Sequence, residues 1–300
     1  MKSYKNIVFQ NNFHNGDLHY SREFAKYLIK HTNAENYYYI HHNSPRLMMD
    51  IPELVSHGTD VPESLKPWET LDLQAHTQEI GDTLYINTWV GRHNLMYHSR
   101  YNSCTIEANY EAFKDTCSEL GLSRDVGPIE NFIPEYDYTP FSTENIDNFF
   151  NTRHTDKMKV LICNGECHSG QAANFDMSPA IGRLCAEYPN VLFLIANESH
   201  TLDYSHPNIY YTSDIIKLQF GDLVENSYVS RFCDIIVGRA SGAFCFACTK
   251  EIWNSDKTVI CFSHGAKEGM WAENSTGLWS DTRDSNQAFN IISQEINKRL

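Results

Sequence analysis

The residues best suited to acid–base chemistry lie in the polar loop after the first apolar strand of the chain. Residues 7–9 form this strand, and a helix with one apolar face begins near residue 20. Between them lie His14, Asp17 and His19. Residues at the carboxyl end of a strand in an open α/β sheet face the ligand crevice. Asp17 can therefore serve as a general base, and His14 or His19 can replace or orient it. The alternative is an acidic residue at a helix N-terminus beside solvated histidines.

A second segment, residues 235–243, contains residue types that are suited to binding an anion. Apolar residues 235–237 predict a strand, which stops at the small-residue turn 238–242 and is followed by a compact helical run. A helix start offers backbone N–H groups and a favourable dipole to phosphate, and Arg239 adds a positive charge with several donors. The alternative is that Ser241 is only a helix N-cap and Gly242 only a packing glycine. The predicted phosphate ligands at this turn are Arg239, Ser241, Gly242 and Ala243.

Two further loops fit the same phosphate-bearing ligand. The loop after the apolar run 159–163 contains Gly165 and Gly170, and glycines there let a ligand approach the backbone closely. The loop after the strand predicted for 258–262 contains Lys267, which can meet a phosphate, and Glu268, which can meet a ribose hydroxyl. For these last two residues an ordinary surface position is the alternative.

Alternating strand and helix patterns predict that two α/β halves position these residues. The strands predicted at 159–163, 191–196 and 258–262 are continuous apolar runs, which is typical of a parallel sheet buried on both faces. Prolines at 128, 134 and 140 punctuate a stretch without clear periodicity, which we interpret as a linker. We therefore predict two Rossmann-like domains facing a cleft, at residues 1–140 and 141–300. A last helix with Phe289, Ile292 and Ile296 inward is expected to pack back on the N-terminal domain.

Composition excludes several classes of partner. The chain has 300 residues, of which 41% are hydrophobic and 21% charged, so it is typical of a soluble globular protein. Its net charge of -14 disfavours nucleic acid and anionic membrane surfaces. There is no signal-peptide pattern and no apolar run long enough to span a bilayer, so we expect a cytoplasmic protein without an integral membrane segment. The nine cysteines lie mostly in apolar runs, which indicates reduced, buried thiols.

Motifs for metal and cofactor chemistry are missing from the sequence. No D-x-D triplet, Walker loop, H-E-x-x-H helix or nucleophile elbow is present. His41 and His42 are adjacent on a predicted strand, where neighbouring side chains point to opposite faces and cannot chelate as a pair. Cys245-x-x-Cys248 has metal-like spacing but lacks a second pair nearby. We therefore predict no cofactor and no metal.

The pairs Gly16-Asp17 and Ser241-Gly242, together with the two-half layout, resemble the GT-B glycosyltransferases and in particular their heptosyltransferase-like group. That group carries a Gly-Asp whose aspartate is the catalytic base and a Ser-Gly at the donor diphosphate. The resemblance implies an acceptor near Asn15 and Gly16, a nucleotide-sugar donor in the C-terminal half, and inverting transfer. The group usually has an acidic residue before its Ser-Gly, whereas this chain has Arg239-Ala240, which predicts extra positive charge on the donor phosphates.

These inferences predict a glycosyltransferase. It would move a sugar from a nucleotide-diphosphate sugar to a hydroxyl of a glycan or small-molecule acceptor, using Asp17 as the base and no metal ion. One alternative is a nucleotide-sugar epimerase of the same two-domain plan. Another is a non-catalytic protein that binds nucleotide sugars through a degenerate first loop.

Overall fold

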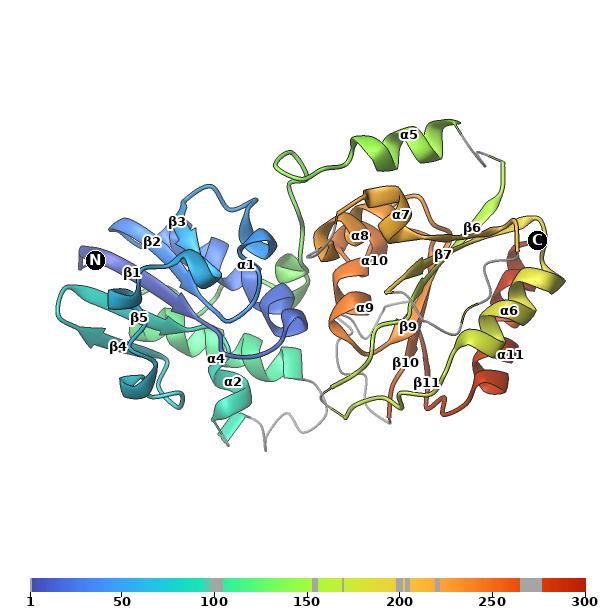
Figure 1. Ribbon diagram of the computed structural model, residues 1–300. Coiled ribbons are helices and arrows are strands. Elements are labelled where there is room, and N and C mark those ends of the chain that lie inside the picture. The colour runs from blue at the N-terminus through green and yellow to red at the C-terminus, as the bar shows by residue number, and fades with distance from the viewer. Residues whose placement is uncertain are drawn as a thin grey trace. The chain divides into compact units, whose positions relative to one another are not determined.

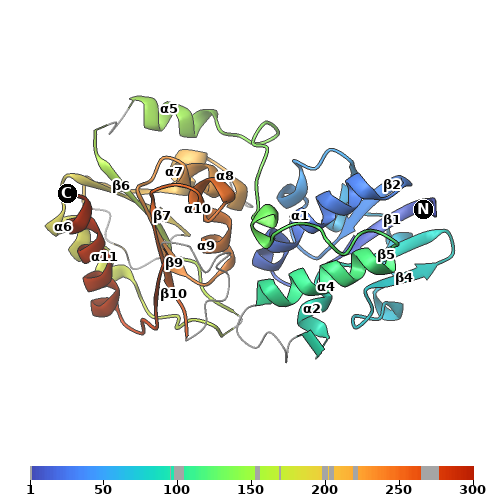
Figure 2. The same ribbon diagram turned by 180° about the vertical axis from the view of Figure 1, so that it is seen from behind.

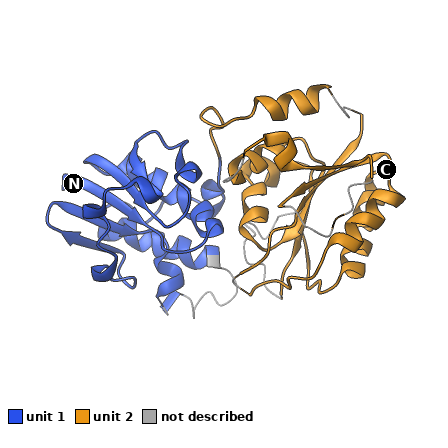
Figure 3. Ribbon diagram, in the orientation of Figure 1, with its two compact units in different colours: residues 1–135 blue, residues 136–300 orange. Residues whose placement is uncertain are grey.

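A computed structural model describes residues 2–94, 96–97, 105–152, 156–168, 170–197, 202, 206–218, 222–264 and 277–300. The chain forms two compact units, Met1–Glu135 and Tyr136–Leu300 (Figure 3). The boundary between them falls after Glu135, whereas the sequence placed it after residue 140. Each unit is built around its own sheet (Figure 1).

The sheet of the first unit has the strand order β3-β2-β1-β5-β4. β1 pairs in parallel with β2 and β5, and β2 pairs in parallel with β3. β4 runs antiparallel to β5, because the two strands are joined by a tight turn at Gly81, where φ is +63°. The strands are β1 (Tyr4–Gln10), β2 (Ala34–Ile40), β3 (Leu54–His57), β4 (Thr77–Ile80) and β5 (Thr83–Asn87).

Side chains alternate between the two faces of this sheet, and different elements cover each face. Tyr39 points toward α1, where its hydroxyl lies 2.7 Å from Ser21 Oγ. α1 and α4 lie side by side, with the rings of Phe24 and Phe113 stacked at 4.6 Å (Figure 2). On the other face, Val8 and Ile40 pack with residues of the segment between β3 and β4. The helices are α1 (Asn15–His31), α2 (Val90–His93) and α4 (Thr105–Glu119), with 3₁₀ turns η1 (Pro45–Met48), η2 (Gly58–Asp60), η3 (Glu63–Leu65), η4 (Trp68–Thr70) and η5 (Ile129–Phe132).

The sheet of the second unit has the order β11-β10-β9-β6-β7-β8, and every neighbouring pair is parallel. Counted from β8, the strands come third, second, first, fourth, fifth and sixth in the chain, which is the order of dinucleotide-binding sheets. The strand order therefore reverses between β6 and β9. The strands are β6 (Met158–Cys163), β7 (Val191–Ala196), β8 (Ile209–Tyr211), β9 (Ile235–Arg239), β10 (Thr258–Phe262) and β11 (Leu278–Ser280).

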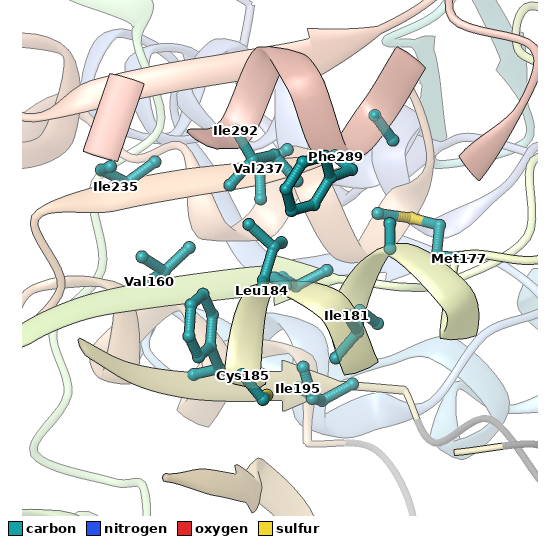
Figure 4. Packing of buried hydrophobic residues seen from close by; sticks show 14 of the residues in the cluster. Val160, Met177, Ile181, Leu184, Cys185, Ile195, Ile235, Val237, Phe289 and Ile292 are labelled. Carbon is teal, nitrogen blue, oxygen red and sulfur yellow. The ribbon is translucent and has the colours of Figure 1, made fainter. Parts of the chain in front are cut away.

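Helices cover both faces of the second sheet. On one face, Val160, Ile195 and Val237 pack against Leu184 of α6 and Ile292 of α11 (Figure 4). The residues next to them in each strand point the other way and pack against the remaining helices. Continuous apolar strands are thus buried on both sides, as the sequence indicated. The helices are α5 (Glu144–Thr152), α6 (Ser178–Glu187), α7 (Thr212–Ile216), α8 (Leu223–Ser230), α9 (Gly242–Ala247), α10 (Lys250–Trp253) and α11 (Ser285–Arg299).

One prediction about the organisation of the chain was wrong. α11 does not leave the second unit, because Phe289, Ile292 and Ile296 are buried in that unit's own core against α6. The boundary between the units lies within the proline-rich stretch that we interpret as a linker, and residues on each side of the boundary pack on their own unit. The ring centroids of Phe132 and Phe24, both in the first unit, are 5.4 Å apart. Those of Tyr136 and Phe246, both in the second unit, are 5.9 Å apart.

The apolar pattern of the sequence predicts a strand over residues 84–90, and β5 is shorter than this prediction. β5 ends at Asn87, and α2 begins at Val90. The side chain of Asn87 accepts a hydrogen bond from the backbone N–H of Trp89 at 2.9 Å, which closes a turn directly after the strand. This turn brings Arg92 and His93 to the carboxyl edge of the sheet.

Candidate active site

In the first unit the candidate site lies at the carboxyl end of the central strand β1. Asp17 is in the first turn of α1, and its side chain is 25% exposed. Its carboxylate accepts a hydrogen bond from the backbone N–H of His14 at 2.8 Å. Burial raises the pKa of Asp17 to about 6, although the His14 N–H, the His14 ring and Arg92 all act to lower it. A carboxylate with a pKa near 6 is well matched to general-base work at neutral pH.

The two histidines of this segment lie in different surroundings. His14 is the N-cap of α1, and its side chain is 64% exposed, with Nδ1 3.8 Å from Asp17 Oδ2. His19 is buried, and its ring lies 5.2 Å from the ring of Tyr20. The prediction that His19 is a candidate base is therefore corrected, because a buried ring inside the helix packing is closed to a substrate. Asn15 and Gly16, the predicted acceptor-side residues, are half-buried in the first turn of α1.

The loop between β1 and α1 is held by two asparagines that the sequence did not single out. Asn11 accepts from the Phe13 N–H at 3.1 Å and donates to Ser21 Oγ at 3.2 Å. Asn43, which follows β2, donates through Nδ2 to the carbonyl oxygen of Phe13 at 3.1 Å. Both residues lie just beyond the carboxyl end of a strand, and that position is the signal that could have identified them.

In the second unit three loops converge where the strand order reverses. Gly165 follows β6, Asn197 follows β7, and Ala243 is in the first turn of α9. A Cβ atom on Gly165 would lie 3.2 Å from Ala243 Cβ and 3.4 Å from Asn197 Oδ1, so a side chain at 165 would crowd both neighbours. Close packing of these neighbours is thus one reason for a glycine at position 165, and the approach of a ligand to its backbone stays a prediction. Gly170 turns the same loop at the surface, with φ at +78° and open space beside it.

Ser241 presents an unused hydroxyl at this edge of the sheet. It is the N-cap of α9, but its side chain makes no capping hydrogen bond. Its Oγ is buried and has no hydrogen-bond partner within the ranges that the structure describes. A buried hydroxyl is normally hydrogen-bonded, so a ligand oxygen is a natural partner for this one. Gly242 and Ala243, in the first turn of α9, are half-buried and buried.

Arg239 has a different role from the predicted one. The last residue of β9, it is 3% exposed, and its guanidinium donates to backbone carbonyl groups of the loop after β6. Nε bonds the Ala173 oxygen at 3.2 Å, Nη1 bonds the Asn164 oxygen at 2.9 Å, and Nη2 bonds the Phe175 oxygen. The prediction of a phosphate-binding arginine is corrected, because the side chain is buried and these carbonyl groups accept from Nε, Nη1 and Nη2. Arg239 instead fixes the path of the loop that carries Gly165.

The same loop is held at a second point. Gln171 donates through Nε2 to the carbonyl oxygen of Ala240 at 2.9 Å. Its own backbone carbonyl oxygen accepts from Ser263 Oγ at 3.0 Å and from the His264 N–H at 2.7 Å. The loop after β6 is thus tied to the ends of both β9 and β10. Lys267 and Glu268, the other predicted donor ligands, lie outside the described residues.

Metal ligands do not gather in the described ranges. No group of three histidine, cysteine or acidic side chains there is arranged to hold a metal ion. His41 is buried after the end of β2, and burial, followed by the neighbouring His57, lowers its pKa to about 3. The requirement for a metal in catalysis is a separate question, and independence from metal stays a prediction.

No protein-family model matches this chain, and no curated protein sequence matches it. Solved structures do match. The glycosyl transferase family 9 protein of Veillonella parvula superposes with a TM-score of 0.54 at 9% identity, over 98% of this chain and 89% of its own. The E. coli heptosyltransferase WaaC with ADP-2-deoxy-2-fluoro heptose has a TM-score of 0.52 at 9% identity. The match covers 98% of this chain and 100% of WaaC. The UDP-GlcNAc 2-epimerase of Neisseria meningitidis bound to UDP-GlcNAc has a TM-score of 0.50 at 10% identity. The match covers 99% of this chain and 92% of the epimerase.

Similarity at this level of identity shows the fold. The chain has the two-sheet α/β architecture of GT-B glycosyltransferases and of the related epimerases, which confirms the predicted fold class. The resemblance to the heptosyltransferase-like group extends over nearly the whole chain at the level of the fold. None of the helices in the described ranges combines the length and the apolar character needed to cross a membrane.

Proposed function

We propose that the protein is a glycosyltransferase that moves a sugar from a nucleotide-diphosphate sugar to an acceptor hydroxyl. The observation that carries the proposal is Asp17, a partly buried carboxylate with a pKa of about 6 at the carboxyl end of the central strand. The fold supports it, because structures of the same fold include a heptosyltransferase with a bound ADP-sugar analogue.

In this mechanism Asp17 takes the proton of the acceptor hydroxyl. The acceptor oxygen forms a bond to the anomeric carbon of the donor, and the bond from that carbon to the diphosphate breaks. The electron pair of the broken bond leaves with the nucleoside diphosphate. A single displacement of this kind inverts the anomeric configuration. His14, which is exposed beside Asp17, is the second residue placed to influence the proton transfer.

The donor diphosphate would bind in the second unit, at the reversal between β6 and β9. Ser241 offers its unpartnered hydroxyl, and the first turn of α9 follows directly. Gly165 packs beside Ala243 at the same place. Donors fixed in place before the reaction stabilise the charge that develops on the leaving group. We therefore propose catalysis without a divalent ion, with Arg239 acting on the donor through the loop that it holds.

The free cysteines of the chain are an argument about the cellular compartment in which the reaction occurs. Eight cysteines in the described part of the chain are free, and all but Cys245 are buried. Thiols persist in reducing compartments. We propose that the protein works in the cytoplasm, in the synthesis of a polysaccharide or another glycan.

The test is an assay of purified protein with a panel of ADP-, UDP-, GDP- and CMP-sugars, with and without simple glycan acceptors. Transfer of the sugar to an acceptor with release of nucleoside diphosphate supports the proposal. The epimerase alternative rests on the Neisseria structure of the same fold. It predicts a changed sugar without an acceptor, whereas a binding protein would take up the nucleotide sugar and leave it unchanged.

A further inference from the structure

One peptide group near Asp17 is held from both sides. Its N–H, which belongs to His14, donates to Asp17 Oδ2 at 2.8 Å. Its carbonyl oxygen, which belongs to Phe13, accepts from Asn43 Nδ2 at 3.1 Å. Asn43 follows β2, whereas Asp17 lies in α1, so the peptide group connects the ends of two strands to the candidate base.

We propose that Asn43 is a positioning residue, which acts through this peptide group to hold the His14 N–H against the carboxylate of Asp17. This inference rests on the proposed function, because it gives Asp17 the role of base. Asn43 has no contact with the reacting atoms in this scheme. Its role is to fix the geometry and the basicity of Asp17.

The physical link is the polarisation of the amide. Hydrogen bonds in a chain strengthen one another, so donation to the Phe13 carbonyl makes the His14 N–H a better donor. A hydrogen bond to a carboxylate favours its ionised form. The charged or titratable groups that face Asp17 are the His14 ring and Arg92 of α2, and both also lower its pKa against the effect of burial. Asn43 adds no charge of its own and acts only through the peptide group.

Asn43 is itself held in place by its surroundings. Its backbone N–H donates to Nδ1 of His41 at 3.2 Å. Gly58, which follows β3 as the first residue of η2, packs against both residues with its backbone φ at +63°. A Cβ at position 58 would lie 2.8 Å from His41 Cε1 and 2.9 Å from the backbone carbonyl oxygen of Asn43, so this close contact requires glycine. The ends of β3, β2 and β1 thus form one connected support that leads to Asp17.

The test is Asn43→Ala, with Asn33→Ala as the matched control. Asn33 lies directly before β2, at its opposite end, and makes one exposed side-chain hydrogen bond to Ser3 at 3.4 Å. The pKa of the Asp17 carboxyl is measured by carbon NMR in aspartate-labelled protein, and the pH profile of kcat/KM is recorded in parallel. In Asn43→Ala we expect the pKa of Asp17 to rise by about half a pH unit and the acidic limb of the profile to move to higher pH by the same amount. At a given pH on that limb, kcat/KM should then be about threefold lower. The control should leave both unchanged.

An unchanged Asp17 pKa in folded Asn43→Ala would overturn the inference. Asn43→Leu preserves the branched shape of the side chain and removes the donor without adding a charge, so it replaces the alanine variant if the latter does not fold, and it is expected to raise the pKa as well. The NMR titration needs no turnover. If Asp17→Asn remains fully active, the role of Asp17 as base fails, and if no nucleotide sugar is transferred by the native protein, the proposed function fails. In both cases the titration still decides whether Asn43 acts on Asp17.

Discussion

Replacing Asp17 by asparagine should separate activity from stability. The new amide keeps the shape of the side chain, and its oxygen can still accept from the His14 N–H, which lies 2.8 Å from the carboxylate in the native protein. The substitution removes the proton-accepting charge, so transfer should fall by about 10²-fold or more. Donor affinity should stay the same, because the donor ligands belong to the other unit.

The stability of the same variant should rise. The pKa of Asp17 rises from 3.8 to about 6 on folding, chiefly through burial. A raised carboxyl pKa means that the folded state prefers the protonated form. The protonated Asp17 therefore makes its full contribution to the stability of the folded state below pH 3.8, and this contribution is lost as the pH rises through about 6. At about 1.4 kcal/mol per pKa unit, the ionised group costs up to about 3 kcal/mol at pH 7. Asp17→Asn should recover part of this cost at pH 7 and none of it below pH 4.

The assays are transfer kinetics and denaturant unfolding at pH 7 and pH 4, with Asp284→Ala as the control. Asp284 caps α11 by accepting from the N–H groups of Asn286 at 2.9 Å and Gln287 at 3.0 Å. The control should lose about 1 kcal/mol of stability and none of the activity. Near-normal transfer by Asp17→Asn would refute the role of base and leave Asp17 as a capping residue, with His14 the next candidate.

Three further predictions concern the donor side. Arg239→Ala should lower the free energy of unfolding by about 3 kcal/mol, because several buried carbonyl groups lose their donors, and an unchanged urea midpoint would contradict the contacts described. Ser241→Ala should weaken ADP binding by about three- to tenfold in calorimetry without lowering the melting temperature, since its hydroxyl has no protein partner in the described ranges. A drop in melting temperature with unchanged ADP affinity would make it a packing residue. Protein treated with EDTA should keep most of its transfer rate, and a loss restored by Mg²⁺ or Mn²⁺ would show that a metal takes part.

The fold was predictable because its signals are local. The apolar runs that became β6, β7 and β10 are continuous, and continuous apolar strands indicate a parallel sheet covered on both faces. β11 was missed, since its three residues include a half-buried tryptophan and a serine and carry no clear pattern. The polarity of residues 55–79 likewise concealed the elements that cover one face of the first sheet.

The candidate site was predictable only where function depends on neighbours in the sequence. Asp17 follows a strand and begins a helix, and both features are visible in the chain itself. The misassignment of Arg239 has a different origin, because the carbonyl groups that occupy it come from residues 164–175, far away in the sequence. Asn43 was missed for the same reason, as its partner is Phe13. Such pairings are determined by how the strands are ordered in the sheet.

Under the proposed function, the way Arg239 holds its loop affects how readily the protein could change its donor. Three of its contacts are to main-chain oxygens, which every amino acid supplies equally. Glu166 and His168 lie on the same loop with exposed side chains, so their identities can change while the backbone keeps its path. Under the proposed function, selection, natural or in the laboratory, can therefore alter the chemistry that this loop offers to a donor by substitutions at these two positions, with little cost to folding.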